Sequence, residues 1–204
     1  VLFRSLKTRA PQSSLAPWSE QLLNFAATIT AERTRLVNEL NPLVSKNYHE
    51  LNEVKPASII YKSNTDGLSE DTEINLQLLR RKLEELQYQE IERGVTLVGP
   101  HRDDLILQLG EFPAKGYASH GESWSFAISL KIAALELLKR NGLDPILILD
   151  DLFAELDSTR RARLVQATKL AEQTSVTAAV ESDLPNDLND ERYYVANNKV
   201  VSQK

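Results

Sequence analysis

With 204 residues, of which 42% are hydrophobic, the chain is long enough for one sizeable core or for two smaller lobes. It has no cysteine, which excludes disulfides, thiolate zinc sites and a cysteine nucleophile. The net charge of -5 argues against a uniformly basic nucleic-acid-binding surface, and no apolar run of about 18 residues predicts a membrane span. We therefore expect a soluble, cytoplasmic protein.

The first residue of the sequence is informative about whether the chain is a complete protein. The chain begins at Val1 and contains no methionine, whereas a complete translation product begins with one. We expect the chain to be a fragment. Val1–Ser5 is expected to be non-native, because this apolar stretch leads into no recognisable element.

Two long helices are predicted in the N-terminal half. Apolar residues recur at helical spacing in Trp18–Tyr48, with Pro42 as a site for a bend, and again in Glu70–Glu92. Between the helices, Pro56–Lys62 is predicted to be a strand and Ser63–Asp71 a loop. Two long helices with a strand between them predict a mainly helical, arm-like subdomain.

Short apolar runs follow the second long helix. Thr96–Gly99 and Leu105–Leu109 are predicted to be strands separated by turn-forming residues. A broad apolar face predicts a helix over Glu122–Lys139, and the pair Asn141 and Gly142 is typical of a helix C-terminus.

The last third of the chain alternates strands with helices. The unbroken apolar run Pro145–Asp150 predicts a parallel strand that is buried on both faces. This alternation predicts an α/β fold with a parallel-rich sheet. The later predicted elements are a helix capped by Asp157 or Ser158 that ends near Gln173, a buried strand at Ser175–Val180, and a hairpin at Tyr193–Ser202 that turns at Asn197 and Asn198.

Two acidic residues, Asp150 and Asp151, directly follow the apolar run. Ligands of open parallel sheets bind at the C-terminal ends of the strands. A carboxylate there can hold Mg²⁺ through its water shell beside nucleotide phosphates, and a second carboxylate can orient or deprotonate the attacking water. The pattern indicates a Walker B strand. The alternative is that two acidic residues simply end a strand.

Two further segments favour the nucleotide-binding interpretation. Ser119, Gly121 and Glu122 form an S-x-G-E turn before a helix, where N–H groups, a hydroxyl and a glycine suit a γ-phosphate. Downstream, Glu155, Leu156 and Asp157 have the spacing of an ABC D-loop. A signature turn, helix, Walker B strand and D-loop in this order indicate an ABC-type ATPase.

Three segments also resemble the RecF family of bacterial DNA replication and repair proteins. They are GPHRDDL at Gly99–Leu105, SHGESWSFAISLKIAALELL at Ser119–Leu138 and DDLFAELDSTRR at Asp150–Arg161. The SHGESWSF form is similar to actinobacterial members, and the resemblance extends from about Trp18 onward. It implies a helical arm subdomain at residues 1–92 and the C-terminal half of an ABC-type (P-loop NTPase-like) ATPase lobe at residues 93–204.

The resemblance implies roles for the candidate site residues. Asp150 would be the Walker B magnesium residue, Asp151 the catalytic carboxylate, Ser119, Gly121 and Glu122 the signature motif, and Asp157 the D-loop aspartate. In such ATPases the signature of one subunit completes the ATP site of the other, so that ATP with Mg²⁺ holds a homodimer together.

The resemblance further implies ATP-dependent DNA binding at single-strand gaps and junctions. RecR and RecO would be partners, and RecA loading the outcome. No G-x-x-x-x-G-K-[ST] loop occurs in the sequence, so we expect the Walker A loop to lie upstream and this piece alone to be inactive. No histidine follows the D-loop, and Thr177 or Glu181 stands near the switch-histidine position, which suits a slow, DNA-stimulated ATPase. The alternatives are an SMC-like structural head and a catalytically silent interaction module.

A sheet without its first strands would expose an apolar edge, so we expect this piece of the protein to behave poorly in isolation.

Several residues have two possible interpretations. The open cases are the basic groups Arg33 with Arg35, Arg80–Lys82 and Arg160, Arg161 and Arg163, as solvated faces or phosphate contacts; His101 and Arg102, as structural hydrogen bonds or contacts to nucleotide or DNA; and Trp124, as core or as a base-stacking platform.

Overall fold

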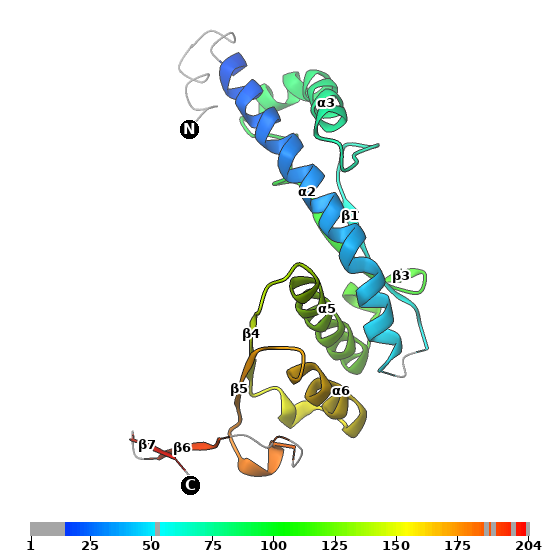
Figure 1. Ribbon diagram of the computed structural model, residues 1–204. Helices are drawn as coiled ribbons and strands as arrows, with labels where there is room; N and C mark the ends of the chain where they lie inside the picture. The colour runs from blue at the N-terminus through cyan, green and yellow to red at the C-terminus, as the bar shows by residue number, and fades with distance from the viewer. Residues whose placement is uncertain (1–14, 52–53, 186–187, 189–190, 197–198, 203–204) are drawn as a thin grey trace.

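The computed structural model describes residues 15–51, 54–185, 188, 191–196 and 199–202, so the expectation for Val1–Ser5 lies outside the described residues. Figure 1 shows an elongated molecule, with the first two long helices at one end and the remaining large helices at the other. In chain order the elements are α2 (Ala16–His49), β1 (Ala57–Lys62), α3 (Thr72–Arg93), β2 (Asp104–Leu109), β3 (Phe112–Pro113), α4 (Ala114–Tyr117), α5 (His120–Arg140), β4 (Ile146–Asp150), the 3₁₀ turn η2 (Phe153–Glu155), α6 (Ser158–Thr168), β5 (Gln173–Thr177), the 3₁₀ turn η3 (Glu181–Asp183), β6 (Tyr193–Ala196) and β7 (Lys199–Ser202).

The two long predicted helices are confirmed as α2 and α3. Helix α2 continues through Pro42, and α3 begins at the N-cap Asp71, whose carboxylate accepts hydrogen bonds from the N–H groups of Glu73 and Ile74. Helix α3 ends at Gly94, where a φ of 68° lies in the left-handed region that favours glycine. The two helices share an apolar core formed by Leu23, Ala26, Ala27, Leu79, Leu83 and Val98.

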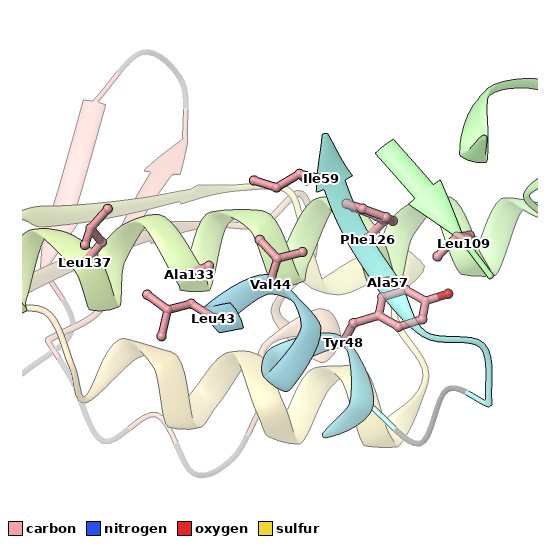
Figure 2. Close-up of a cluster of buried hydrophobic side chains, with 9 residues drawn as sticks. All are labelled: Leu43, Val44, Tyr48, Ala57, Ile59, Leu109, Phe126, Ala133 and Leu137. Atoms are coloured by element: carbon pink, nitrogen blue, oxygen red, sulfur yellow. The ribbon is translucent and has the colours of Figure 1, made fainter. Parts of the chain in front are cut away.

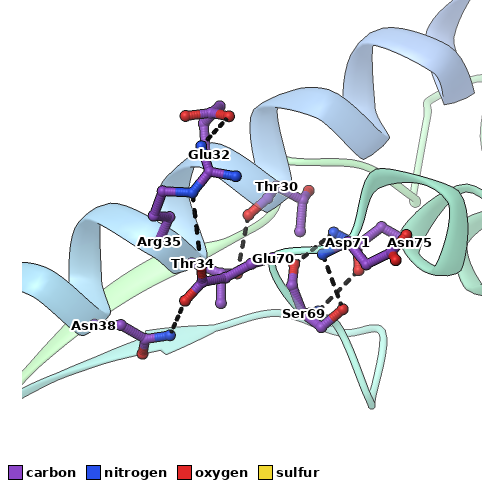
Figure 3. A network of polar contacts seen from close by, with 9 residues as sticks. All are labelled: Thr30, Glu32, Thr34, Arg35, Asn38, Ser69, Glu70, Asp71 and Asn75. Carbon is purple, nitrogen blue, oxygen red and sulfur yellow. Dashed lines mark hydrogen bonds and ion pairs between the residues drawn. The ribbon is translucent and has the colours of Figure 1, made fainter.

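Polar side chains fix the predicted loop before α3 against α2 (Figure 3). Asn38 donates to Glu70 at 2.7 Å, and Arg35 lies 3.6 Å from the same carboxylate. The buried Asn75 side chain accepts from the Ser69 N–H and donates to the Ser69 carbonyl, each at 2.8 Å. Because the buried amide is paired on both sides, the loop has a defined position relative to both helices.

The middle of the molecule is an antiparallel sheet in the order β1-β2-β3, in which Ile59 is paired with Leu107. The end of α2 and the face of α5 close the core beside this sheet, and the rings of Tyr48 and Phe126 lie 5.7 Å apart (Figure 2). The division at residues 92 and 93 stays a prediction, but β1 and β2 lie on opposite sides of it, and their pairing joins the two parts. The buried cluster comprises Leu43, Val44, Tyr48, Ala57, Ile59, Leu109, Phe126, Ala133 and Leu137.

The strand predicted at Thr96–Gly99 is wrong, whereas β2 confirms the one predicted at Leu105–Leu109. The backbone N–H groups of Leu97 and Val98 donate to the buried side chain of Glu90, at 2.5 and 3.2 Å. Since these donors bond to a carboxylate on α3, they are not available to a strand ladder.

The predicted parallel pairing is confirmed by β4 and β5, and with it the α/β class. The prediction that β4 is buried on both faces is wrong. Leu149 is 5% exposed on the face covered by α5 and α6, but Ile146 and Ile148 on the other face are 60% and 69% exposed. This side of the parallel pair therefore presents an apolar surface.

The helix and the strand that follow β4 have different bounds from those predicted. Helix α6 ends at Thr168 instead of near Gln173, because residue 173 already pairs with Ile146 as the first residue of β5. Strand β5 therefore begins and ends earlier along the chain than predicted, and the strand is half exposed. The hairpin of β6 and β7 is confirmed, whereas its predicted turn at Asn197 and Asn198 lies outside the described residues. No helix in the described part of the chain is long and apolar enough to cross a membrane.

Candidate functional site

The predicted signature turn forms the N-terminus of α5. Ser119 is its N-cap, and the Ser119 hydroxyl accepts from the Glu122 N–H at 3.2 Å while the Glu122 carboxylate accepts from the Ser119 N–H at 2.8 Å. This reciprocal pair is a capping box, which fixes the first turn of the helix. Ser119 and His120 are exposed, so this well-defined helix start is accessible to a ligand. A helix N-terminus of this kind suits an anion.

A cation from outside the helix holds Glu122 in place. Lys55, in the segment that follows α2, lies 2.6 Å from its carboxylate. The hydrogen bond from Lys55, together with those from Ser119, lowers the pKa of Glu122 to about 2. The carboxylate is therefore ionised at neutral pH and remains available for the capping box. No sequence pattern indicated Lys55, since it lies far from the motif along the chain.

An arginine connects the signature turn with the D-loop. Arg160 of α6 donates from Nε to the buried Ser125 hydroxyl of α5 at 2.7 Å, and its guanidinium forms an ion pair with Asp157. Asp157 is the N-cap of α6 and also accepts from the Arg160 N–H at 2.9 Å. This hydrogen bond, with the guanidinium charge, lowers the pKa of Asp157.

Gly121 lies in contact with this arginine. A Cβ at position 121 would lie 3.4 Å from Nη2 of Arg160, so the guanidinium packs directly against the glycine. Gly121, Ser125 and Asp157, from two helices, are thus gathered around one side chain. The sequence had placed Gly121 and Asp157 in two separate motifs.

The acidic pair lies where the sequence predicted, at the C-terminal end of β4. Thr177, the last residue of β5, donates from its hydroxyl to Asp150, and the Asp151 N–H donates to that hydroxyl at 3.1 Å. Among the described residues other than glycine, Asp151 alone has a positive φ, of 50°. Such backbone outliers are concentrated at functional sites, and both carboxylates are exposed at this edge.

The two groups of candidate residues remain separate within this chain. In the part of the chain that the structure describes, no hydrogen bond or ion pair joins Ser119, Gly121 or Glu122 to the Asp150–Asp151 pair. The described residues also contain no cluster of three or more histidine or acidic side chains able to enclose a metal.

The basic residues of the arm fit the interpretation as a solvated face, whereas those of α6 do not. Arg35 and Arg80 have partly exposed side chains and form surface ion pairs with acidic residues of the arm. Arg161 donates to the Phe153 carbonyl at 3.0 Å, and Arg163 pairs with Glu50 and bonds to the buried Asn47. The arginines of α6 are thus internal contacts and neither a solvated face nor a phosphate track.

Contacts inside the protein also account for three other residues. Arg102 donates to the Thr96 carbonyl at 2.6 and 2.9 Å, and the His101 ring lies 2.9 Å from the Thr96 hydroxyl, in line with the structural interpretation. Trp124 donates to His120 at 3.0 Å and lines an apolar groove of about 510 Å³ between α5 and β4, so it is neither fully core nor a free stacking platform.

Comparison with known proteins agrees with the resemblance that the motifs show. No protein-family model matches the chain. The DNA replication and repair protein RecF of Streptomyces avermitilis is 46% identical over 189 residues, which are 92% of this chain and 51% of that protein. The chain therefore spans about half the length of the curated relative that it matches.

Solved structures share the fold. A structure of the recombination mediator protein RecF with ATPrS has a TM-score of 0.84 at 22% identity, covering all of this chain and 54% of its own. The RecF–ATP structure has a TM-score of 0.82 at 24% identity, covering 98% of this chain and 55% of its own. These likenesses confirm the predicted fold class. Over the half of such a protein that it spans, this chain is similar to RecF in sequence and in fold.

Proposed function

We propose that the protein containing this chain is an ATP-dependent DNA-binding mediator of recombinational repair. It binds DNA at single-strand gaps and junctions in the cytoplasm, dimerises when ATP is bound, and assists RecA loading with RecR and RecO. The observation that carries the proposal is the capping box at an exposed helix start, in a chain 46% identical to RecF. The solved neighbours, described as RecF with ATP or ATPrS in the RecFOR pathway, support it.

The signature end acts on nucleotide held by the partner. Ser119 and the first N–H groups of α5 form an anion site, and the capping box keeps it in place before any ligand arrives. A γ-phosphate bound there would connect the two subunits, and its hydrolysis would remove the connection. The site faces outward on this chain, as a contact between subunits requires.

The acidic end acts on nucleotide held by its own subunit. Mg²⁺ bound there would neutralise charge on the phosphate oxygens. Exposed oxygen donors suit this hard cation, and Asp150 would hold it while Asp151 orients or deprotonates the attacking water. Thr177 supports Asp150 at the place where many ABC ATPases carry a switch histidine. Without an imidazole at this point, turnover is slow.

The proposal is tested on the full-length protein. We expect ATP, but not ADP, to convert monomer to dimer in light scattering, and the dimer to bind gapped DNA more tightly than intact duplex. A protein that stays monomeric with ATP, or that binds both DNAs equally, would favour the alternatives, an SMC-like head or a silent interaction module.

A further inference from the structure

Two of the three arginines of helix α6, Arg160 and Arg163, contact different helices of the protein. Arg163 pairs with Glu50 and bonds to the buried Asn47, both at the C-terminal end of α2. One turn earlier along α6, Arg160 bonds to Ser125 of the signature helix. The start of α6 is therefore held between the arm helix and the signature helix.

Arg160 contacts both elements of the candidate trans site. Its guanidinium pairs with Asp157 in the D-loop and packs against Gly121 in the signature turn. The Arg160 side chain is only 20% exposed. Ser125, its other partner, is fully buried, so this end of the side chain has a defined position. A partly buried, multiply bonded arginine maintains geometry better than a surface ion pair does.

We propose that Arg160 is a positioning residue that fixes the D-loop relative to the signature turn, so that both reach the partner subunit's nucleotide together. This inference rests on the proposed function and adds a residue that neither motif contains. Asp157 and the Ser119 turn start different helices, and in the described structure Arg160 is the side chain that bonds across them. Without it, ATP would still bind its own subunit, but the surface offered to the partner would be less ordered.

The guanidinium geometry is essential to this role. Its Nε bonds to Ser125 while Nη1 pairs with Asp157, so two separated donors are used at once. A lysine carries the same charge but presents one ammonium group and cannot reproduce the fork. Charge alone therefore does not replace Arg160, which distinguishes positioning from simple electrostatic support.

The test uses Arg160→Gln in the full-length protein, with Arg80→Gln as the matched control, because Arg80 forms a surface ion pair with Glu20 in the arm. ATP affinity is measured at protein concentrations below dimerisation, and dimer dissociation by light scattering. We expect unchanged ATP affinity and about a tenfold weaker dimer for Arg160→Gln, equivalent to about 1.4 kcal/mol. Arg160→Lys should restore little, and Arg80→Gln should match the wild type.

Amide hydrogen exchange without nucleotide gives an independent readout. In Arg160→Gln, residues 119–123 and 157–161 should exchange faster together, while the arm is unchanged. Should Arg160→Gln fail to fold, Ser125→Ala removes the Nε acceptor with a smaller change and should show the same pattern. Full dimer strength in a folded variant, or complete rescue by lysine, would overturn the inference. A wild type that does not dimerise with ATP would instead overturn the proposed function on which it rests.

Discussion

The two ends of the candidate site differ in how far this chain alone completes them. At the signature end, Ser119 and Glu122 cap each other, Lys55 pairs with the carboxylate, and Arg160 fixes the neighbouring D-loop. At the acidic end, Asp150 and Asp151 are exposed and bond to the end of β5 and to the segment after it, beside an exposed apolar strand face. One end is preorganised, and the other offers carboxylates at an open edge.

This difference shows what each end requires from elsewhere. The capping box joins residues three positions apart, so the signature turn is ordered once α5 forms. A metal site at a strand end needs further oxygen donors and a covered sheet, which in the described residues β4 and β5 alone do not supply. Substitutions at the acidic end should therefore affect chemistry, and those at the signature end should affect assembly.

Asp150→Asn in the full-length protein should have the largest effect. The amide keeps the shape of the side chain but loses the charge that would hold Mg²⁺, so ATP hydrolysis should fall by about a hundredfold or more. Phosphate release measures it. Asp144→Asn, just before the other end of the same strand and paired with Lys139, is the control. Wild-type turnover in Asp150→Asn would show that the Walker B assignment is wrong.

Ser119→Arg should break assembly without abolishing nucleotide binding. The bulky cation replaces the cap and fills the anion site that faces the partner, so ATP should still bind but the dimer should weaken by at least about tenfold. Light scattering with ATP is the measurement, and Thr28→Arg on the exposed face of α2 places the same side chain elsewhere. An ATP-dependent dimer of unchanged strength would reject the signature role.

Glu122→Gln should give the smallest effect, and one that depends on pH. The folded-state pKa of about 2 lies below the ordinary 4.5, so the stabilisation by Glu122 is complete above pH 4.5 and is lost as pH falls towards 2. The melting temperature of the wild type should exceed that of the variant by a few degrees at pH 7, and the difference should shrink below pH 4.5 and vanish only near pH 2. Glu73→Gln, also in a first helical turn, is the control. A difference independent of pH would show that the Lys55 contact does not determine the shift.

Predictions from the sequence succeeded where the signal is local. The helices α2, α3 and α5 have apolar residues at helical spacing, and the Ser119 cap and the Asp150 strand end follow from short-range chemistry. The false strand at Thr96–Gly99 arose because Glu90 supplies an acceptor that a local pattern does not reveal.

Contacts between residues that are distant along the chain could not be predicted from the sequence either. Nothing in the sequence indicated that Lys55 pairs with Glu122, or that the α6 arginines bond inside the protein. Their spacing alone suits a solvated basic face equally well.

The sequence by itself determined the long helices, the capped start of the signature helix and the acidic end of the Walker B strand. These depend on backbone donors and residues within a few positions of each other. Only the tertiary structure decided that Arg160 joins Asp157 to the signature helix and that one face of β4 stays uncovered. Both depend on how separate helices pack, which local residue patterns do not specify.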